Sequence, residues 1–254
     1  MKVLFVCAHP DDLEFYVSNI MISLAKTHAV KILSMTGGEY GTHTPALAGK
    51  KLAIIRKKEL IQAANIEGVT QVDFAGYLDA HLVINQEVLK KINAYLEVYR
   101  PEVVFAPECF YYFYPHDDHI RSGLIMYHLI QHITPNERPK LFLYHSYVNT
   151  HYFPMKHWRT QSKAIKMHKS QYWLLIPMYP LRFLFGFWFG FRLPRAMWAR
   201  TLLAEAVRYV DFQEDLHKPL GFKQRLFGRI VMKLKNSFKP MIEDLEKAEK
   251  ESQR

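Results

Sequence analysis

Short apolar runs alternate with stretches of helical periodicity through the first half of the chain. The apolar runs predict strands at residues 2–7, 30–35, 72–75, 102–107 and 140–144. The stretches between them predict helices at residues 13–27, 46–64, 86–99 and 118–133. Strands that alternate with helices form βαβ units, and strands with no polar position are typically covered on both faces. We therefore expect an α/β fold with a mostly parallel sheet and helices on both faces.

Polar clusters follow three of the predicted strands directly. His9-Pro10-Asp11-Asp12 comes after the first strand, Thr36-Gly37-Gly38-Glu39 after the second, and Tyr114-Pro115-His116-Asp117-Asp118-His119 after the fourth. Ligands of open parallel sheets bind beyond the carboxyl ends of the strands, so the clusters predict a site at that edge. The chain has neither a G-x-G-x-x-G motif nor a P-loop, so nothing in it indicates a dinucleotide or nucleoside triphosphate site.

Composition narrows the class of protein and its partners. The 254 residues are 49% apolar and 23% charged, enough apolar sequence for a globular core. Lysine and arginine number 34 against 24 acidic residues, and the net charge of +10 indicates an anionic partner, either nucleic acid or a membrane surface. The two cysteines are too few for a disulfide scaffold and fit a reduced, intracellular compartment. The first apolar run is too short for a secretory signal, and an acidic pair follows it.

The two histidine-containing clusters suit a catalytic metal. Such a site takes three nitrogen or oxygen ligands and leaves one position for water. His9, Asp12 and His119 supply two imidazoles and one carboxylate if the strand ends bring both loops together. Asp11 is then left as a general base for that water. The plainer alternative is a pair of solvated loops or helix caps, because Asp is common at an N-cap, but two such clusters at predicted strand ends favour the metal site.

These residues resemble the signatures of a known family. His9-Pro10-Asp11-Asp12-Leu13-Glu14 after the first strand and His116-Asp117-Asp118-His119 after the fourth are similar to the two histidine motifs of the PIG-L/LmbE-like zinc-dependent N-deacetylases. The resemblance extends to Thr36-Gly37-Gly38-Glu39, Arg56-x-x-Glu59 and His168-Lys169-Ser170-Gln171, and so covers residues 1–171. Residues 204–208 look like the family's closing segment.

The resemblance implies a Rossmann-like domain that hydrolyses an N-acetyl group, most often on an N-acetylglucosamine (GlcNAc) derivative. By motif match, His9, Asp12 and His119 bind zinc, and Asp11 is the base. Two histidines and one carboxylate also bind iron, so the ligand set leaves open another divalent metal.

The resemblance also assigns roles to other residues. His116 is the general acid or an electrostatic stabiliser, oriented by Asp118, and Tyr114 helps to polarise the acetyl carbonyl. Arg56 and Asp79 match positions that contact the sugar.

One departure from the family pattern concerns the pocket. Many members carry a glycine pair shortly after the acidic motif, where this chain has Phe15-Tyr16-Val17-Ser18-Asn19. The bulkier side chains narrow or reshape the pocket beside the metal. The metal ligands are intact, so this departure bears on the substrate rather than on hydrolysis.

Residues 172–254 form an apolar and basic C-terminal extension. Residues 172–191 are rich in aromatic side chains, but Pro177, Pro180 and Arg182 interrupt them, which favours an interfacial segment over a transmembrane span. Residues 222–238 have the spacing of a basic amphipathic helix. Together the two predict peripheral attachment to the cytoplasmic face of an anionic membrane. A substrate lid, a subunit contact in a homo-oligomer and a helix docked on the core are the alternatives.

Three functions compete. The leading one is a deacetylase of a GlcNAc-type sugar, with a lipid-linked substrate suggested by the C-terminal extension. The second is a deacetylase of a soluble sugar conjugate or amide metabolite. The third is a non-catalytic module that binds nucleic acid or another anion. The basic residues are mixed with Trp and Phe and match no nucleic-acid motif, so we expect no nucleic-acid partner.

Overall fold

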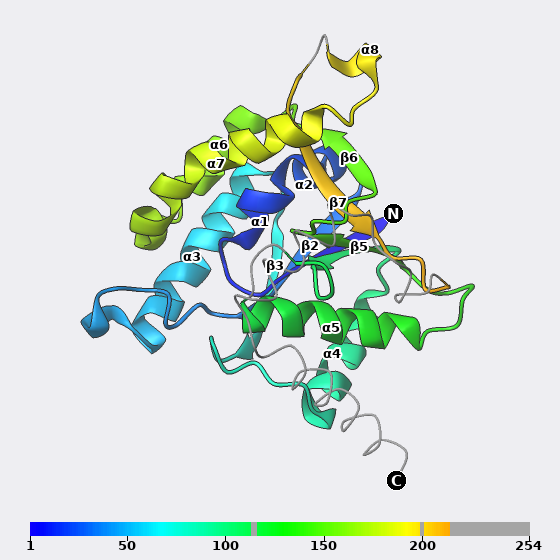
Figure 1. Ribbon diagram of the computed structural model, residues 1–254. Helices are drawn as coiled ribbons and strands as arrows, with labels where there is room; N and C mark the ends of the chain where they lie inside the picture. The colour runs from blue at the N-terminus through cyan, green and yellow to red at the C-terminus, as the bar shows by residue number, and fades with distance from the viewer. Residues whose placement is uncertain (113–115, 199–200, 214–254) are drawn as a thin grey trace.

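A seven-stranded sheet runs through the centre of the protein. A computed structural model describes residues 1–112, 116–198 and 201–213 (Figure 1). The strand order is β3-β2-β1-β4-β5-β7-β6, in which β3 to β5 along this order are parallel and β7 runs antiparallel to both its neighbours. The strands are β1 (Lys2–Cys7), β2 (Ala29–Thr36), β3 (Gln71–Tyr77), β4 (Val103–Pro107), β5 (Lys140–Tyr144), β6 (His151–Pro154) and β7 (Ala204–Tyr209).

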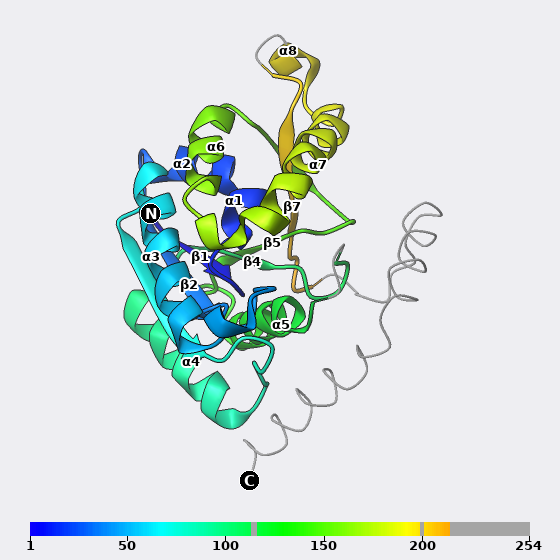
Figure 2. The same cartoon turned by 90° about the vertical axis from the view of Figure 1, so that its left-hand side faces the viewer.

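Helices cover both faces of the sheet, as Figures 1 and 2 show. One face carries α4 (Gln86–Tyr99) and α5 (Asp117–Gln131). The other face carries α1 (Asp12–Tyr16), α2 (Ser18–Ala25), α3 (Lys50–Ile66), α6 (Trp158–Ile165) and α7 (Tyr172–Gly190). A short helix α8 (Arg195–Trp198) and the 3₁₀ turns Pro45–Leu47 and Lys169–Gln171 complete the described elements. The predicted α/β fold with a mostly parallel sheet is confirmed.

The apolar side chains of β1 pack into two separate hydrophobic cores, one on each face of the sheet. Leu4 and Val6 pack with residues of α4 and α5, whereas Val3 and Phe5 pack with residues of α1, α2 and α3. All four side chains have no exposed surface. A strand whose alternate residues both face a helical layer has no room for a polar side chain, which explains why its sequence is uninterrupted.

The single helix predicted over residues 13–27 is wrong in one respect: the structure has two helices there, α1 and α2. The chain breaks at Val17, with φ −141° and ψ 14°. Two amides in the first turn of α2, at Asn19 and Ile20, each donate to the Glu205 carboxylate of β7 at 2.9 Å. A carboxylate from a distant strand therefore caps the second helix. The hydrophobic periodicity of residues 13–27 does not predict this contact or the helix break.

Two regular elements between residues 144 and 172, β6 and α6, were not predicted. Residues 172–191 fold as α7, which contains Pro177 and Pro180 within its 19 residues. Among the described residues, no helix combines the length and the apolar character needed to cross a membrane. The predicted amphipathic helix at 222–238 lies outside the described residues.

Candidate active site

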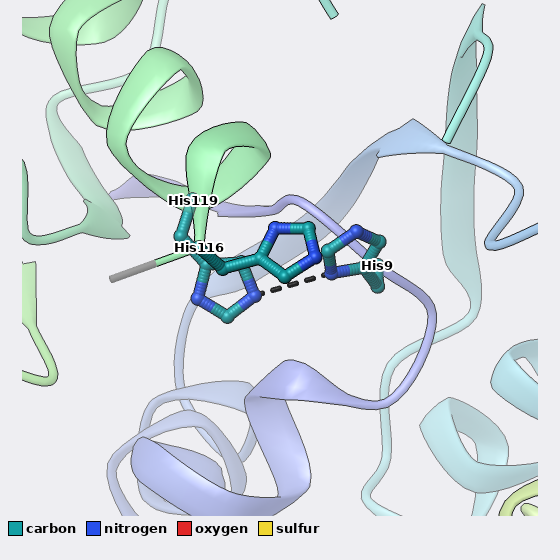
Figure 3. A group of neighbouring side chains, drawn as sticks. All are labelled: His9, His116 and His119. Carbon is teal, nitrogen blue, oxygen red and sulfur yellow. Dashed lines mark hydrogen bonds between the residues drawn. The ribbon is translucent and has the colours of Figure 1, made fainter. Parts of the chain in front are cut away.

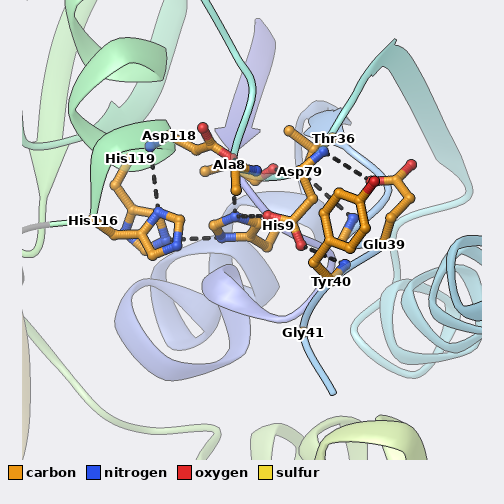
Figure 4. A network of polar contacts seen from close by, with 12 residues as sticks. Ala8, His9, Thr36, Glu39, Tyr40, Gly41, Asp79, His116, Asp118 and His119 are labelled. Carbon is orange, nitrogen blue, oxygen red and sulfur yellow. Dashed lines mark hydrogen bonds and ion pairs between the residues drawn. The ribbon is translucent and has the colours of Figure 1, made fainter. Parts of the chain in front are cut away.

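The carboxyl ends of the parallel strands bring the predicted site residues together. His9, Asp11 and Asp12 follow β1, and Asp79 follows β3. His116 is the N-cap of α5, and His119 lies in the first turn of that helix. Figure 4 shows His9 and Asp79, which follow strands, on one side and His116 and His119 of α5 on the other. Residues more than a hundred positions apart in the chain thus meet at one edge of the sheet.

Three of these side chains place their ligand atoms at metal-binding separations. His9 Nδ1 lies 3.1 Å from His119 Nε2 (Figure 3), and His119 Nε2 lies 3.2 Å from Asp12 Oδ1. His9 Nδ1 and Asp12 Oδ1 are 3.8 Å apart. Tetrahedral ligands at zinc bond lengths are separated by roughly 3.3 Å, so one ion fits between the three atoms. The donor set of two imidazoles and one carboxylate is also one that zinc accepts.

The Asp12 carboxylate is oriented by the backbone beneath it. Its Oδ2 atom accepts hydrogen bonds from the amides of Ala8 and His9, both at 2.9 Å, so that Oδ1 turns toward the two imidazoles. Burial favours the neutral carboxyl, but His119 and His9 outweigh it and hold the pKa of Asp12 well below its usual range. The carboxylate is therefore charged and pre-oriented, as a metal ligand must be.

A second carboxylate supports His9 from behind. His9 Nε2 lies 3.0 Å from Asp79 Oδ1 and 3.4 Å from Asp118 Oδ2. Asp118 in turn accepts a hydrogen bond from the amide of Ala80 at 2.7 Å. A carboxylate on the far nitrogen of a histidine fixes the ring's tautomer and orientation, and this arrangement is usual behind metal-binding histidines.

Within the described residues, two further triads bring ligand atoms within 4.8 Å of one another. One is His9, His116 and His119, and the other is His9, Asp79 and Asp118. Both share His9 with the predicted ligand set, but Asp79 and Asp118 approach its Nε2 atom, whereas His119 and Asp12 lie near Nδ1, so these two carboxylates border the predicted ligand set from the other side of the ring.

Asp11, the predicted base, is held by Arg56 of α3. Its Oδ1 atom accepts a hydrogen bond from Arg56 Nη2 at 2.6 Å. Arg56 also donates from Nη1 to the carbonyl of Gly38 at 3.0 Å. Gly38 has a φ of 67°, and a Cβ atom there would collide with the guanidinium. The glycine of the second polar cluster therefore makes room for the arginine that holds Asp11.

His116 is held in a definite protonation pattern. Its Nδ1 atom accepts a hydrogen bond from the amide of Asp118 at 3.3 Å. Burial, reinforced by His9 and His119, lowers the pKa of His116 to about 4. A neutral imidazole that accepts at Nδ1 carries its proton on Nε2 and can donate from there.

The predicted sugar contacts, Arg56 and Asp79, are both buried, with 3% and 5% of their surfaces exposed. Arg56 is bonded to Asp11, and Asp79 lies against His9 and accepts from the amide of Tyr40 at 3.0 Å. Both side chains thus hold other site residues in this structure. The predicted carbonyl-polarising residue, Tyr114, lies outside the described residues.

Residues of the Arg56-x-x-Glu59 and His168-Lys169-Ser170-Gln171 motifs connect the helices around the site. Glu59 on α3 accepts hydrogen bonds from the amide and the hydroxyl of Ser170, at 2.9 and 2.6 Å. His168 Nε2 lies 3.2 Å from Glu14 Oε1, and neither side chain is exposed. These contacts fix α1, which begins with the ligand Asp12, against α3 and the turn before α7.

Sequence reasoning missed His145. It follows β5 directly, has a φ of 66°, and its ring centroid lies 6.4 Å from that of His119. Tyr16 stacks on it with a centroid separation of 4.0 Å. The strand-end rule that found His9 would also have found His145, because a histidine at the carboxyl end of a parallel strand points to the same edge.

Two proteins of assigned function are similar in sequence. Diacetylchitobiose deacetylase from Thermococcus kodakarensis is 30% identical over 125 residues, which are 49% of this chain and 47% of that protein. The match thus spans about half the length of this relative. A probable N-acetyl-α-D-glucosaminyl L-malate deacetylase 2 from Bacillus anthracis is 28% identical over 159 residues, covering 59% of this chain and 67% of that protein.

A solved structure and a family match agree with the fold. The N,N'-diacetylchitobiose deacetylase of Pyrococcus horikoshii, in complex with an inhibitor, superposes with a TM-score of 0.74 at 23% identity, over 83% of this chain and 84% of that one. Residues 4–130, half of the chain, match the PIG-L family, described as GlcNAc-PI de-N-acetylase. They contain both histidine motifs, the one that follows β1 and the one at the start of α5. The chain therefore belongs to the PIG-L family.

Proposed function

We propose that this protein is a metal-dependent hydrolase that removes the N-acetyl group from a GlcNAc-type sugar. The observation that carries the proposal is the convergence of His9 Nδ1, Asp12 Oδ1 and His119 Nε2 within 3.8 Å of one another. Asp11 lies between His9 and Asp12 in the sequence, and His116 lies three residues before His119; they supply acid–base and hydrogen-bonding groups. The deacetylase relatives support this reaction class.

His9, Asp12 and His119 would hold the metal, zinc or another divalent ion. When bound, the ion polarises the acetyl carbonyl and lowers the pKa of a water molecule toward neutrality.

Asp11 serves as the general base. Arg56 engages its Oδ1 atom, and no described residue hydrogen-bonds to Oδ2, which is left to accept a proton from the attacking water. The same carboxyl then returns a proton to the amine as it leaves, because an amine is expelled only once it is protonated. One side chain thus carries the proton from water to the leaving nitrogen.

His116 stabilises the oxyanion of the tetrahedral intermediate. The amide of Asp118 donates to Nδ1, so a neutral ring carries its proton on Nε2 and can donate it to the developing negative charge. This favours a hydrogen-bonding role over that of general acid. Tyr114 provides a second donor in this proposal, and Asp118 orients His116 through its backbone amide.

Arg56 and Asp79 act first as positioning residues. Their contacts to Asp11 and His9 would have to open before either side chain could bond a sugar hydroxyl. Asp79 therefore fixes a metal ligand, and Arg56 fixes the base.

The substrate we propose is lipid-linked and is met at an anionic membrane surface. Support comes from the outer face of α7 and the residue that follows it, where Phe187, Trp188 and Phe191 expose 44%, 67% and 56% of their surfaces. We call these three residues the aromatic face. Exposed aromatic rings beside basic residues suit the headgroup region of a bilayer. A soluble sugar conjugate is the competing substrate.

Release of acetate tests the proposed activity. The purified protein, loaded with zinc, is incubated with GlcNAc compounds that are free, conjugated to small organic acids or linked to lipid, and acetate is measured. We expect turnover that a chelator abolishes and zinc restores. Turnover of soluble conjugates alone would favour the competing substrate, and no acetate from any compound would overturn the proposed reaction.

A further inference from the structure

An apolar cavity of about 110 Å³ lies between α1, α7 and the strands β6 and β7. Helix α7 contributes Met178, Leu181, Phe185 and Phe189 to its wall. These positions follow the spacing of one helix face, so this side of α7 forms one wall of the cavity, whereas the residues of the aromatic face do not line it. From α1 come Phe15 and Tyr16, the residues that stand where many family members carry a glycine pair.

The cavity adjoins the candidate active site. His145 and Tyr16 line it together and stack with ring centroids 4.0 Å apart. The centroid of His145 lies 6.4 Å from that of His119, a proposed metal ligand. The Tyr16–His145 pair therefore joins the cavity wall to the surroundings of His119, and a group attached to a substrate at the metal centre would reach the cavity past this pair.

The buried side chain of Arg182 also lines the cavity. Arg182 is 6% exposed, and its guanidinium lies over the rings of Tyr179 and Phe183 at 4.6 and 4.5 Å. Nη2 donates to the Ser162 hydroxyl at 3.2 Å, whereas Nε and Nη1 have no hydrogen-bond partner among the described residues. Glu205 also lines the cavity, but its carboxylate is engaged by α2 amides.

We infer that the cavity binds an aliphatic chain carried by the substrate. The inference rests on the proposed deacetylase site, whose substrate it specifies. The cavity is several times larger than the roughly 10–15 Å³ that a single water molecule requires, so it has room for a run of methylene groups. Its wall is largely apolar, and only a ligand with apolar surface gains by displacing water from it. The free donors of Arg182 suit an acceptor oxygen on that chain.

Two positions on an N-acylated sugar can carry such a chain, and two substrate series separate them. The first series consists of methyl, butyl and octyl glycosides of GlcNAc, with the chain on the anomeric oxygen. The second consists of glucosamine N-acylated with acetyl, butanoyl or octanoyl groups. All compounds are used below their micelle concentrations, and kcat/KM and the dissociation constant are measured for each.

We expect one series to improve with chain length. Each methylene that is fully buried strengthens binding by about fourfold, so the octyl or octanoyl compound should exceed its shortest homologue by at least tenfold. The series that responds identifies where the chain is attached. Constants that do not vary with length in either series would overturn the inference.

Variants of α7 test whether the cavity is responsible. Leu181→Asp and Phe185→Asp place a carboxylate in the wall at positions that are 44% and 46% exposed, where folding tolerates it. Each should reduce the long-to-short ratio to within threefold of unity. The matched control is Leu184→Asp, on the same helix but outside the cavity wall and 62% exposed, which should retain the native ratio. Equal ratios in all three variants would overturn the assignment to this cavity.

Failure of the proposed reaction is distinguishable from failure of this inference. Calorimetry on protein treated with chelator measures binding without turnover. If binding strengthens with chain length, Leu181→Asp abolishes that dependence and no acetate is released, the cavity binds the chain but the proposed deacetylation is wrong. If acetate is released but neither the rate nor the affinity varies with chain length, the proposed deacetylation stands and the chain-binding site is wrong.

Discussion

Arg56 Nη2 lies 2.6 Å from Asp11 Oδ1, and both side chains are buried. The arginine reaches its partner from the middle of α3, and its second nitrogen is anchored on the carbonyl of Gly38. A base bonded at one oxygen cannot rotate freely, so its other oxygen keeps a fixed direction. Such positioning contributes to catalysis without any contact between Arg56 and the reacting atoms.

Replacing Arg56 separates a positioning role from sugar binding. Arg56→Gln removes the charge and the fork that holds Asp11, and we expect kcat to fall by about 10²-fold while KM changes by less than threefold. Steady-state kinetics on a GlcNAc substrate measures both. Lys58→Gln, an exposed position on the same helix, is the matched control and should leave both constants unchanged. A large rise in KM with kcat retained would instead identify Arg56 as a sugar ligand.

Asp11→Asn tests the base directly. Asparagine keeps the size of the side chain but cannot accept the proton, and general base catalysis contributes about 10²–10⁴-fold. We expect kcat to fall by that factor while the metal content of the purified protein stays the same. Activity within threefold of the native protein would remove Asp11 from this role.

The metal ligands are tested by metal analysis rather than by activity. The double variant His9→Ala, His119→Ala removes two of the three proposed ligands, and the ratio of metal to protein should fall from about one to near zero. Unchanged stoichiometry would place the metal elsewhere.

Asp79→Asn probes the support behind His9. The amide cannot hold the imidazole as a carboxylate does, and loss of such a partner weakens metal affinity by about 10–100-fold. Competition with a chelator measures the affinity. Asp73→Asn on β3 is a suitable control, because its side chain is 44% exposed and pairs with Lys31, away from the site.

The sequence was most informative where local pattern and topology coincide. His9 and Asp12 end an apolar strand, and His119 begins a helix after another, so the strand-end rule brought them to one edge without further information. His145 follows β5 in the same way, and it lines the cavity under α7 beside the candidate active site.

The hydrophobic pattern of the sequence does not predict contacts between segments that are far apart in the chain. The break at Val17 depends on Glu205, which lies 188 positions further along the chain. The partner of Asp11 is a buried arginine on α3, whereas a charged residue on a helix is ordinarily assigned to solvent or to a ligand. In both cases a buried charge finds its partner through the tertiary fold, and local periodicity does not encode that choice.

A buried ion pair joins β4 to β7 and should control stability at low pH. Glu108 accepts from Arg208 Nε at 2.7 Å and Nη2 at 2.8 Å, and from the amides of Cys109 and Phe110. Burial opposes the charge, but Arg208 and these amides hold the pKa of Glu108 below its usual value. Its stabilising contribution is therefore complete above the unfolded-state pKa and is lost as the pH falls through the lower folded-state pKa.

Glu108→Gln should destabilise the protein by about 3–5 kcal/mol at pH 7, because it leaves the Arg208 charge buried without a counter-charge. The difference from the native protein should shrink below pH 4. Urea unfolding at several pH values measures it, with Glu97→Gln on the surface of α4 as the control. A deficit that stays constant down to pH 3 would show that the charge of Glu108 is not its source.

Membrane attachment through the aromatic face is tested by replacing Phe187, Trp188 and Phe191 with serine. Phe189 is left intact because it lines the cavity. The native protein should sediment with vesicles of phosphatidylserine and phosphatidylcholine, more strongly as the anionic fraction rises, and part should stay bound in high salt. The bound fraction in high salt reflects inserted rings rather than charge, so the triple variant should lose that fraction first.

A matched variant controls for a general loss of apolar surface. Ile54, Ile55 and Ile61 on α3 expose 50%, 39% and 42% of their surfaces, and their replacement by serine should leave vesicle binding unchanged. Equal losses in both triple variants would point to nonspecific adsorption. If the native protein stays in the supernatant with anionic vesicles at low salt, the aromatic face is better explained as a subunit contact or substrate lid. A lipid-linked substrate would then depend on the cavity beneath α7 alone, because that cavity accepts a chain whether or not the protein touches a bilayer.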